Sequence, residues 1–164
     1  GRGHIVSVPE MPHPDKPKIE EWVEKLREIV HPDGKTILVG HSIGCQAILR
    51  YLAQIKGETK IAGIVLIAPW MQLDQTTIEE EGEEVAGIAR QWMETSIDFG
   101  KVKSRIGTAV AIFSDDDPYV PFTQKEIFEK ELGAHIIVEH NKRHFSPRDG
   151  ISELPSALDA IMGI

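Results

Sequence analysis

A serine between two glycines is the first feature of this sequence that could do chemistry. Gly40-His-Ser-Ile-Gly44 matches the pattern G-x-S-x-G, in which a strand turns sharply into a helix and projects a serine hydroxyl. We expect both glycines to be required, because a side chain at either position would collide with the turn or the helix. Ser42 would lie at a helix N-terminus, where free N–H groups favour developing negative charge. The pattern therefore predicts Ser42 as a nucleophile and the amide of Ile43 as an oxyanion donor.

A histidine and a cluster of aspartates farther along the chain could complete such a site. Histidine exchanges a proton near neutral pH, and His144 follows an apolar stretch in a loop, so it is the predicted base. An acid after a strand can hold that imidazole in the required tautomer, and Asp115, Asp116 and Asp117 compete for this role. A solvated turn is the alternative for each aspartate. The chain order serine, aspartate, histidine is that of α/β-hydrolases.

Other side chains in the sequence could also react or line the same site. His140 and His144 have the spacing of a metal-binding pair on a helix, but the residues between them do not suggest a helix. No metal and no cofactor are therefore expected. Cys45 is interpreted as a small buried residue rather than a second nucleophile. We expect His41 and Trp70 to line the substrate pocket, with simple packing as the alternative for Trp70.

The elements that must position these residues alternate along the chain. Apolar runs predict strands, and periodic patterns and capping signals predict helices between them. The expected strands cover residues 5–8, 36–39, 61–68, 108–113 and 135–138, and the expected helices cover 18–30, a segment directly after Gly44, 77–93, 123–133 and 155–162. This alternation predicts a doubly wound α/β fold, a mainly parallel sheet with helices on both faces, in a single domain over residues 1–164. Ligands bind such sheets where the strands end.

Composition excludes some classes of partner. The formal net charge of −8 argues against nucleic acid or an anionic membrane surface, because both select for basic patches. No apolar run approaches the roughly 20 residues needed to span a bilayer. One cysteine cannot form an intrachain disulfide, which predicts a reducing, cytoplasmic setting. A small molecule is the expected substrate, and a protein partner or a homodimer stays open.

With these residues identified, the chain resembles the small single-domain serine hydrolases of the retinoblastoma-binding and YdeN type. The matching segments are residues 9–14, 19–22, 40–52, 116–121 and 144–145, so the resemblance covers almost the whole chain. It implies an α/β-hydrolase fold, Asp117 as the acid and His144 as the base. Arg143 stands where these proteins usually have a glycine.

The resemblance also implies a missing N-terminal segment and a small cap. Family members begin with a strand and an oxyanion loop that have no counterpart here, so we expect an N-terminally truncated chain whose second oxyanion donor comes from elsewhere. The family carries a small cap that here corresponds to residues about 71–105. The cap residues expected to roof the site are Ile78, Val85, Ile88, Ala89 and Trp92.

The expected function is hydrolysis of a small ester or amide through an acyl-enzyme on Ser42. An inactive or weakly active scaffold that binds a protein partner is the alternative, favoured by the missing strand and opposed by the complete set of catalytic residues. A thioesterase or transacylase would use the same three residues. These reaction classes use the same residue types in the same order, so the substrate class stays open.

Overall fold

The computed structural model describes residues 3–164, and its sheet contains four parallel strands in the order β1-β2-β3-β4. The strands are β1 (Ile37–His41), β2 (Ile61–Ile67), β3 (Ile106–Ser114) and β4 (His135–Glu139). The helices are α1 (Ile19–Ile29), α2 (Ile43–Gln54), α3 (Gln75–Glu80), α4 (Glu83–Glu94), α5 (Phe99–Arg105), α6 (Gln124–Leu132) and α7 (Pro155–Gly163), with a short 3₁₀ turn at Pro147–Asp149. The prediction of an α/β fold with a parallel sheet is confirmed.

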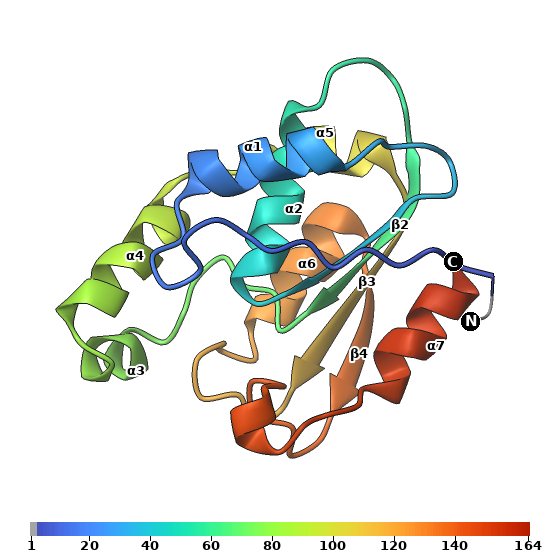
Figure 1. The fold of residues 1–164 in the computed structure, drawn as a ribbon. Helices are drawn as coiled ribbons and strands as arrows, with labels where there is room; N and C mark the ends of the chain where they lie inside the picture. Colours follow the sequence, from blue (N-terminus) through green and yellow to red (C-terminus); the bar gives the residue numbers. More distant parts are fainter. Residues whose placement is uncertain (1–2) are drawn as a thin grey trace.

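The two central strands are covered on both faces. β2 and β3 are almost continuously apolar, as expected of parallel strands between helical layers. α2 packs against β1, and α1 and α5 pack against α2, whereas α7 contacts β2 and β3 from the other face (Figure 1). Helices therefore cover both faces, although one face carries only α7 among the helices that contact the sheet in residues 3–164. β1 is an edge strand, and no segment of the described chain pairs with its outer side.

Several predicted boundaries differ from the structure for local reasons. The helix expected over residues 77–93 is two helices, separated at Gly82, whose φ of 105° breaks the helical path. α3 begins before Thr77, because Asp74 caps it by accepting a hydrogen bond from the Thr77 amide. α5 was not predicted. Residues 5–8 form no strand, and three of their apolar side chains are exposed.

A buried arginine ties α4 to α2. The Arg50 side chain is 3% exposed and donates hydrogen bonds to the carbonyl oxygens of Trp92 and Thr95, at 2.8 and 2.7 Å. These carbonyls lie at the C-terminal end of α4, where a cation is favoured and unpaired acceptors need partners. The end of α4 is therefore held against the helix that follows Ser42.

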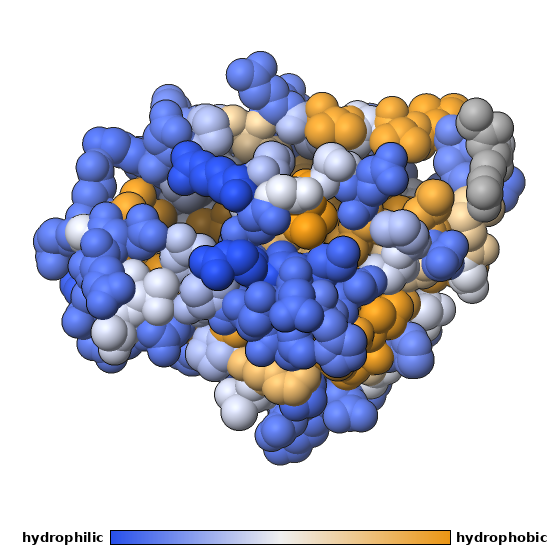
Figure 2. Space-filling model, turned by 90° about the horizontal axis from the view of Figure 1, so that it is seen from below, coloured by the Kyte–Doolittle hydropathy of each residue, from blue (hydrophilic) through white to orange (hydrophobic). Residues whose placement is uncertain are grey.

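All four strands end at the same edge of the sheet, which is the lower side of the molecule in Figure 1. Seen from below, this side is mostly hydrophilic, with hydrophobic residues visible in separate patches (Figure 2). Within the described chain, no helix combines the length and the apolar character needed to cross a bilayer. The loops that follow the strands meet at this edge and carry the predicted reactive residues.

Candidate active site

Ser42 lies at a sharp turn between β1 and α2. Its backbone has φ 52° and ψ −121°, a conformation that L-residues rarely adopt and that is often found at functional sites. Gly40 permits this turn, because a Cβ atom there would lie 2.9 Å from the Cys45 nitrogen and 2.9 Å from Ile48 Cδ1. Gly44 differs, since a Cβ atom at that position would meet nothing within 4 Å. The expectation that both glycines avoid a collision is therefore right for Gly40 and wrong for Gly44.

The two glycines give a matched pair of alanine variants. We expect Gly40→Ala to lower the free energy of unfolding by about 1–3 kcal/mol, because its methyl group would press on the backbone of Cys45. Gly44→Ala should leave stability unchanged or raise it by up to about 1 kcal/mol, because alanine is the better helix former at an open position. Urea unfolding followed by circular dichroism measures both values. Equal losses in the two variants would contradict this account.

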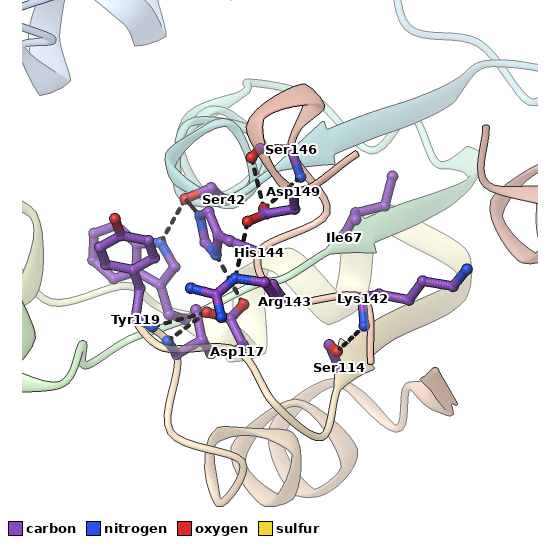
Figure 3. A network of polar contacts seen from close by, with 12 residues as sticks. Ser42, Ile67, Ser114, Asp117, Tyr119, Lys142, Arg143, His144, Ser146 and Asp149 are labelled. Atoms are coloured by element: carbon purple, nitrogen blue, oxygen red, sulfur yellow. Dashed lines mark hydrogen bonds and ion pairs between the residues drawn. The ribbon is translucent and has the colours of Figure 1, made fainter. Parts of the chain in front are cut away.

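Ser42, His144 and Asp117 form a continuous chain of hydrogen bonds (Figure 3). Ser42 Oγ lies 2.9 Å from His144 Nε2, and His144 Nδ1 lies 2.8 Å from Asp117 Oδ2. The Asp117 side chain is 2% exposed and also accepts the amides of Tyr119 and Val120. An ionised carboxylate can only accept, so the Nδ1 proton points to Asp117 and leaves Nε2 free to accept the Ser42 hydroxyl proton. This arrangement allows proton transfer from serine to histidine.

Each of the three competing aspartates has its own hydrogen-bond partners near His144. Asp117 contacts the imidazole, whereas Asp115 pairs with His140 at 2.6 Å, and this hydrogen bond lowers the pKa of Asp115 and raises that of His140. Asp116 accepts hydrogen bonds from the Ser114 hydroxyl and the Arg143 amide, and the Ser114 bond holds its pKa below the usual range. Asp115 and Asp116 therefore hold the loop, and Asp117 alone reaches the ring of His144.

His41 also contacts this loop. Its Nε2 atom lies 2.7 Å from the His144 carbonyl oxygen, and the two rings are 5.1 Å apart. The neighbours of His144 have unusual backbones, since φ is 48° at Arg143 and 54° at Phe145. Where glycine was expected from the resemblance, arginine therefore adopts a left-handed conformation. The structure places His41 beside the backbone of the base and outside the pocket lining.

A pocket of about 570 Å³ opens at Ser42 and His144. One wall comes from the α3–α4 region and the loop after β3, and the other comes from the loop after β4. The lining residues besides Ser42 and His144 are Leu73, Ile78, Glu81, Val85 and Tyr119 on the first wall, and Arg143, Ser146, Pro147, Arg148 and Asp149 on the second. The Tyr119 hydroxyl donates to Glu81 at 2.7 Å, which joins the two parts of the first wall.

The residues expected to roof the site separate into two groups. Ile78 and Val85 line the pocket. Ile88, Ala89 and Trp92 do not line it, and the Trp92 indole is fully buried against Trp22. The helical pattern of this segment could not distinguish the two groups, because α4 presents apolar side chains both to the pocket and to the main core.

Comparison with known proteins identifies the family of this chain. A family model described as serine hydrolase matches residues 3–162. The chain belongs to the serine hydrolase family. Among curated relatives, this serine hydrolase is 28% identical to YdeN of Bacillus subtilis (strain 168), over 92% of this chain and 75% of that protein. It is 26% identical to the serine hydrolase RBBP9 of Rattus norvegicus, over 82% of this chain and 66% of that protein.

A solved structure supports the same relationship. The crystal structure of the ydeN gene product from B. subtilis superimposes with a TM-score of 0.80 at 27% identity, covering 93% of this serine hydrolase and 78% of that chain. The expected resemblance to the YdeN and retinoblastoma-binding type of serine hydrolase is therefore confirmed. This serine hydrolase spans about two thirds to three quarters of the length of the two curated relatives.

Sequence reasoning missed part of the site of this serine hydrolase. Tyr119 lies two residues after Asp117 in the same loop, which was a usable signal for its position. The loop residues Ser146 and Arg148 were not predicted, because nothing in their spacing indicates which way a loop folds. Cys45 is fully buried, and burial raises the pKa of its thiol well above the usual range, so it is not a competing nucleophile. In the described part of the chain, no group of three or more metal-ligating side chains occurs.

Proposed function

We propose that this serine hydrolase cleaves a small ester or amide through a covalent acyl-enzyme on Ser42, with His144 as the base and Asp117 as the residue that orients it. One observation carries the proposal: the hydrogen-bonded chain from Ser42 Oγ through both nitrogens of His144 to Asp117. Each link is within the distance over which a proton can pass or an imidazole can be held. Membership of the serine hydrolase family supports the same reaction class.

In the proposed first half-reaction, His144 Nε2 takes the Ser42 proton as Oγ attacks the carbonyl carbon. The Asp117 carboxylate stabilises the imidazolium that forms. The oxyanion rests on the amide of Ile43, which lies in the first turn of α2 and donates no hydrogen bond to any group in residues 3–164. His144 then protonates the leaving alcohol or amine, and the acyl group stays on Ser42.

In the second half-reaction, His144 removes a proton from water, which attacks the acyl carbon and releases the acid. The apolar side chains Leu73, Ile78 and Val85 on one wall favour a substrate with a small hydrophobic group. The opposite wall is polar and carries two arginines. We place the activity among carboxylesterase-like reactions, because a pocket of about 570 Å³ suits a small ester.

A fluorophosphonate probe tests the proposed acyl-enzyme. The expected result is one covalent adduct, located on Ser42 by peptide mass spectrometry, together with turnover of short-chain 4-nitrophenyl esters. Heat-unfolded protein is the control, because a serine without its histidine does not react. An unlabelled, folded protein without turnover would contradict the proposal and favour the scaffold function.

Three further expectations stay predictions. A reducing, cytoplasmic setting depends on the single cysteine. A lack of nucleic-acid and membrane-surface binding depends on the net charge of −8. Association with a protein partner or a second copy is the third prediction, and it is the one for which the described part of the structure offers no supporting contact.

A further inference from the structure

A tryptophan outside the pocket lining touches the reacting atom. Trp70 Nε1 donates a hydrogen bond to Ser42 Oγ at 3.2 Å, and the Trp70 residue is 2% exposed. An indole N–H can only donate, so the direction of this bond is settled by its chemistry. Ser42 Oγ therefore has two partners: it donates to His144 and accepts from Trp70.

The segment that carries Trp70 is held by two buried glutamines. Gln46 is fully buried in α2, and its side-chain Nε2 donates to the Trp70 carbonyl oxygen at 3.0 Å. Arg50 donates to Oε1 of the same Gln46 side chain. Gln124 is 7% exposed and accepts the amides of Met71 and Gln72, at 2.9 and 3.0 Å. Hydrogen bonds with these buried, neutral side-chain amides restrict the backbone at Trp70 and directly after it. Trp70 is thus positioned from the helix that follows the nucleophile, through Gln46, and from the start of α6, through Gln124.

The hydrogen bond from Trp70 to Ser42 Oγ changes in strength during the reaction. In the resting protein, the indole N–H meets a hydroxyl oxygen, which is a good acceptor. In an acyl-enzyme, Oγ is the bridging oxygen of an ester, which is a poorer acceptor. When that ester breaks, Oγ gains negative charge, and hydrogen bonds to charged acceptors are roughly twice as strong as neutral ones. Only an interaction that strengthens toward the transition state accelerates a step.

We propose that Trp70 is a further catalytic residue whose indole N–H stabilises Ser42 Oγ as the leaving group when the acyl-enzyme is hydrolysed. This inference rests on the proposed function. In that step, water adds its oxygen to the acyl carbon and gives a proton to His144 Nε2. The tetrahedral intermediate then collapses, the bond between the acyl carbon and Oγ breaks, and its electron pair stays on Oγ. His144 returns the proton to Oγ while the Trp70 N–H donates to the same atom.

The test removes the N–H and keeps the shape of the side chain. Trp70 is replaced by 3-(3-benzothienyl)alanine, in which sulfur takes the place of N–H, and Trp70→Phe is the second variant. The same sulfur isostere at Trp22 is the matched control, because its indole donates to the Pro12 carbonyl away from the site. Stopped-flow kinetics with 4-nitrophenyl acetate separate the burst of acylation from the steady state, and intact-protein mass spectrometry measures the accumulated acyl-enzyme.

We expect the Trp70 isostere to slow deacylation about tenfold and to change the acylation rate by less than about threefold, so the acyl-enzyme accumulates. Trp70→Phe should show the same selective loss, and the Trp22 isostere should behave like the wild type. Wild-type deacylation in the isostere, or equal slowing of both steps in both Trp70 variants, would overturn the inference and leave Trp70 a packing residue. Absence of Ser42-dependent turnover in the wild type would instead overturn the proposed function, and this inference with it.

Discussion

Ser42→Ala is expected to lower kcat for ester hydrolysis by at least about 10⁴-fold, and fluorophosphonate labelling should disappear. Without Oγ no acyl-enzyme can form, and the chain of hydrogen bonds from His144 has no reacting atom at its end. The variant should stay folded, because the hydroxyl is not required to form the turn that Gly40 permits. Steady-state turnover of 4-nitrophenyl acetate and thermal unfolding measure the two properties separately.

A second serine serves as the matched control for this variant. Ser104 is exposed in α5 and donates its hydroxyl to the Lys101 carbonyl, away from the pocket. Ser104→Ala should keep wild-type kcat and full labelling. If Ser42→Ala kept more than about a hundredth of wild-type turnover, another group would be the nucleophile.

Asp117→Asn is expected to lower kcat by about 10³–10⁴-fold while KM changes little. An asparagine amide can donate to His144 Nδ1, which would move the imidazole proton to Nε2 and remove the acceptor that Ser42 needs. The size of the side chain is preserved, so the loss would report the tautomer rather than packing. Measurement of kcat and KM separately checks this, because weaker substrate binding would raise KM instead.

Asp116 provides the neighbouring control. Asp116→Asn keeps a carbonyl oxygen that can accept the Ser114 hydroxyl and the Arg143 amide, so we expect kcat to fall by less than about tenfold. Similar losses in the two variants would mean that the aspartates act together in holding the loop. A larger loss in Asp116→Asn than in Asp117→Asn would contradict the assignment of the acid.

The parts of the site predicted from sequence are those set by local chemistry. Residues 40–44 combine a strand end, two glycines and a serine, and the turn they form depends on atoms within about eight residues of one another. The parallel sheet followed from apolar runs separated by helical patterns, because each signal lies within one element. The choice of Asp117 as the acid required the family resemblance, because three adjacent aspartates have the same local chemistry.

The sequence predictions that were wrong depend on surroundings that no short segment records. The absence of a collision at Gly44 depends on what surrounds the first turn of α2, and no local pattern records that space. The helix expected over residues 77–93 divides at Gly82 because that residue adopts a positive φ, which its type allows but does not require. The expected strand at residues 5–8 forms no strand ladder, and a β-like composition cannot supply a partner.

By itself, the sequence determined the fold class, the nucleophile turn and the order of the three reactive residues, because strand and helix periodicity and glycine chemistry act over short distances. Only the tertiary structure decided that His41 contacts the backbone of His144, that Trp70 donates to Ser42, and that the loop after β4 forms a pocket wall. These contacts join residues 28 to 103 positions apart. Their geometry depends on how packed layers bring loop ends together, which is a property of the whole core rather than of any segment.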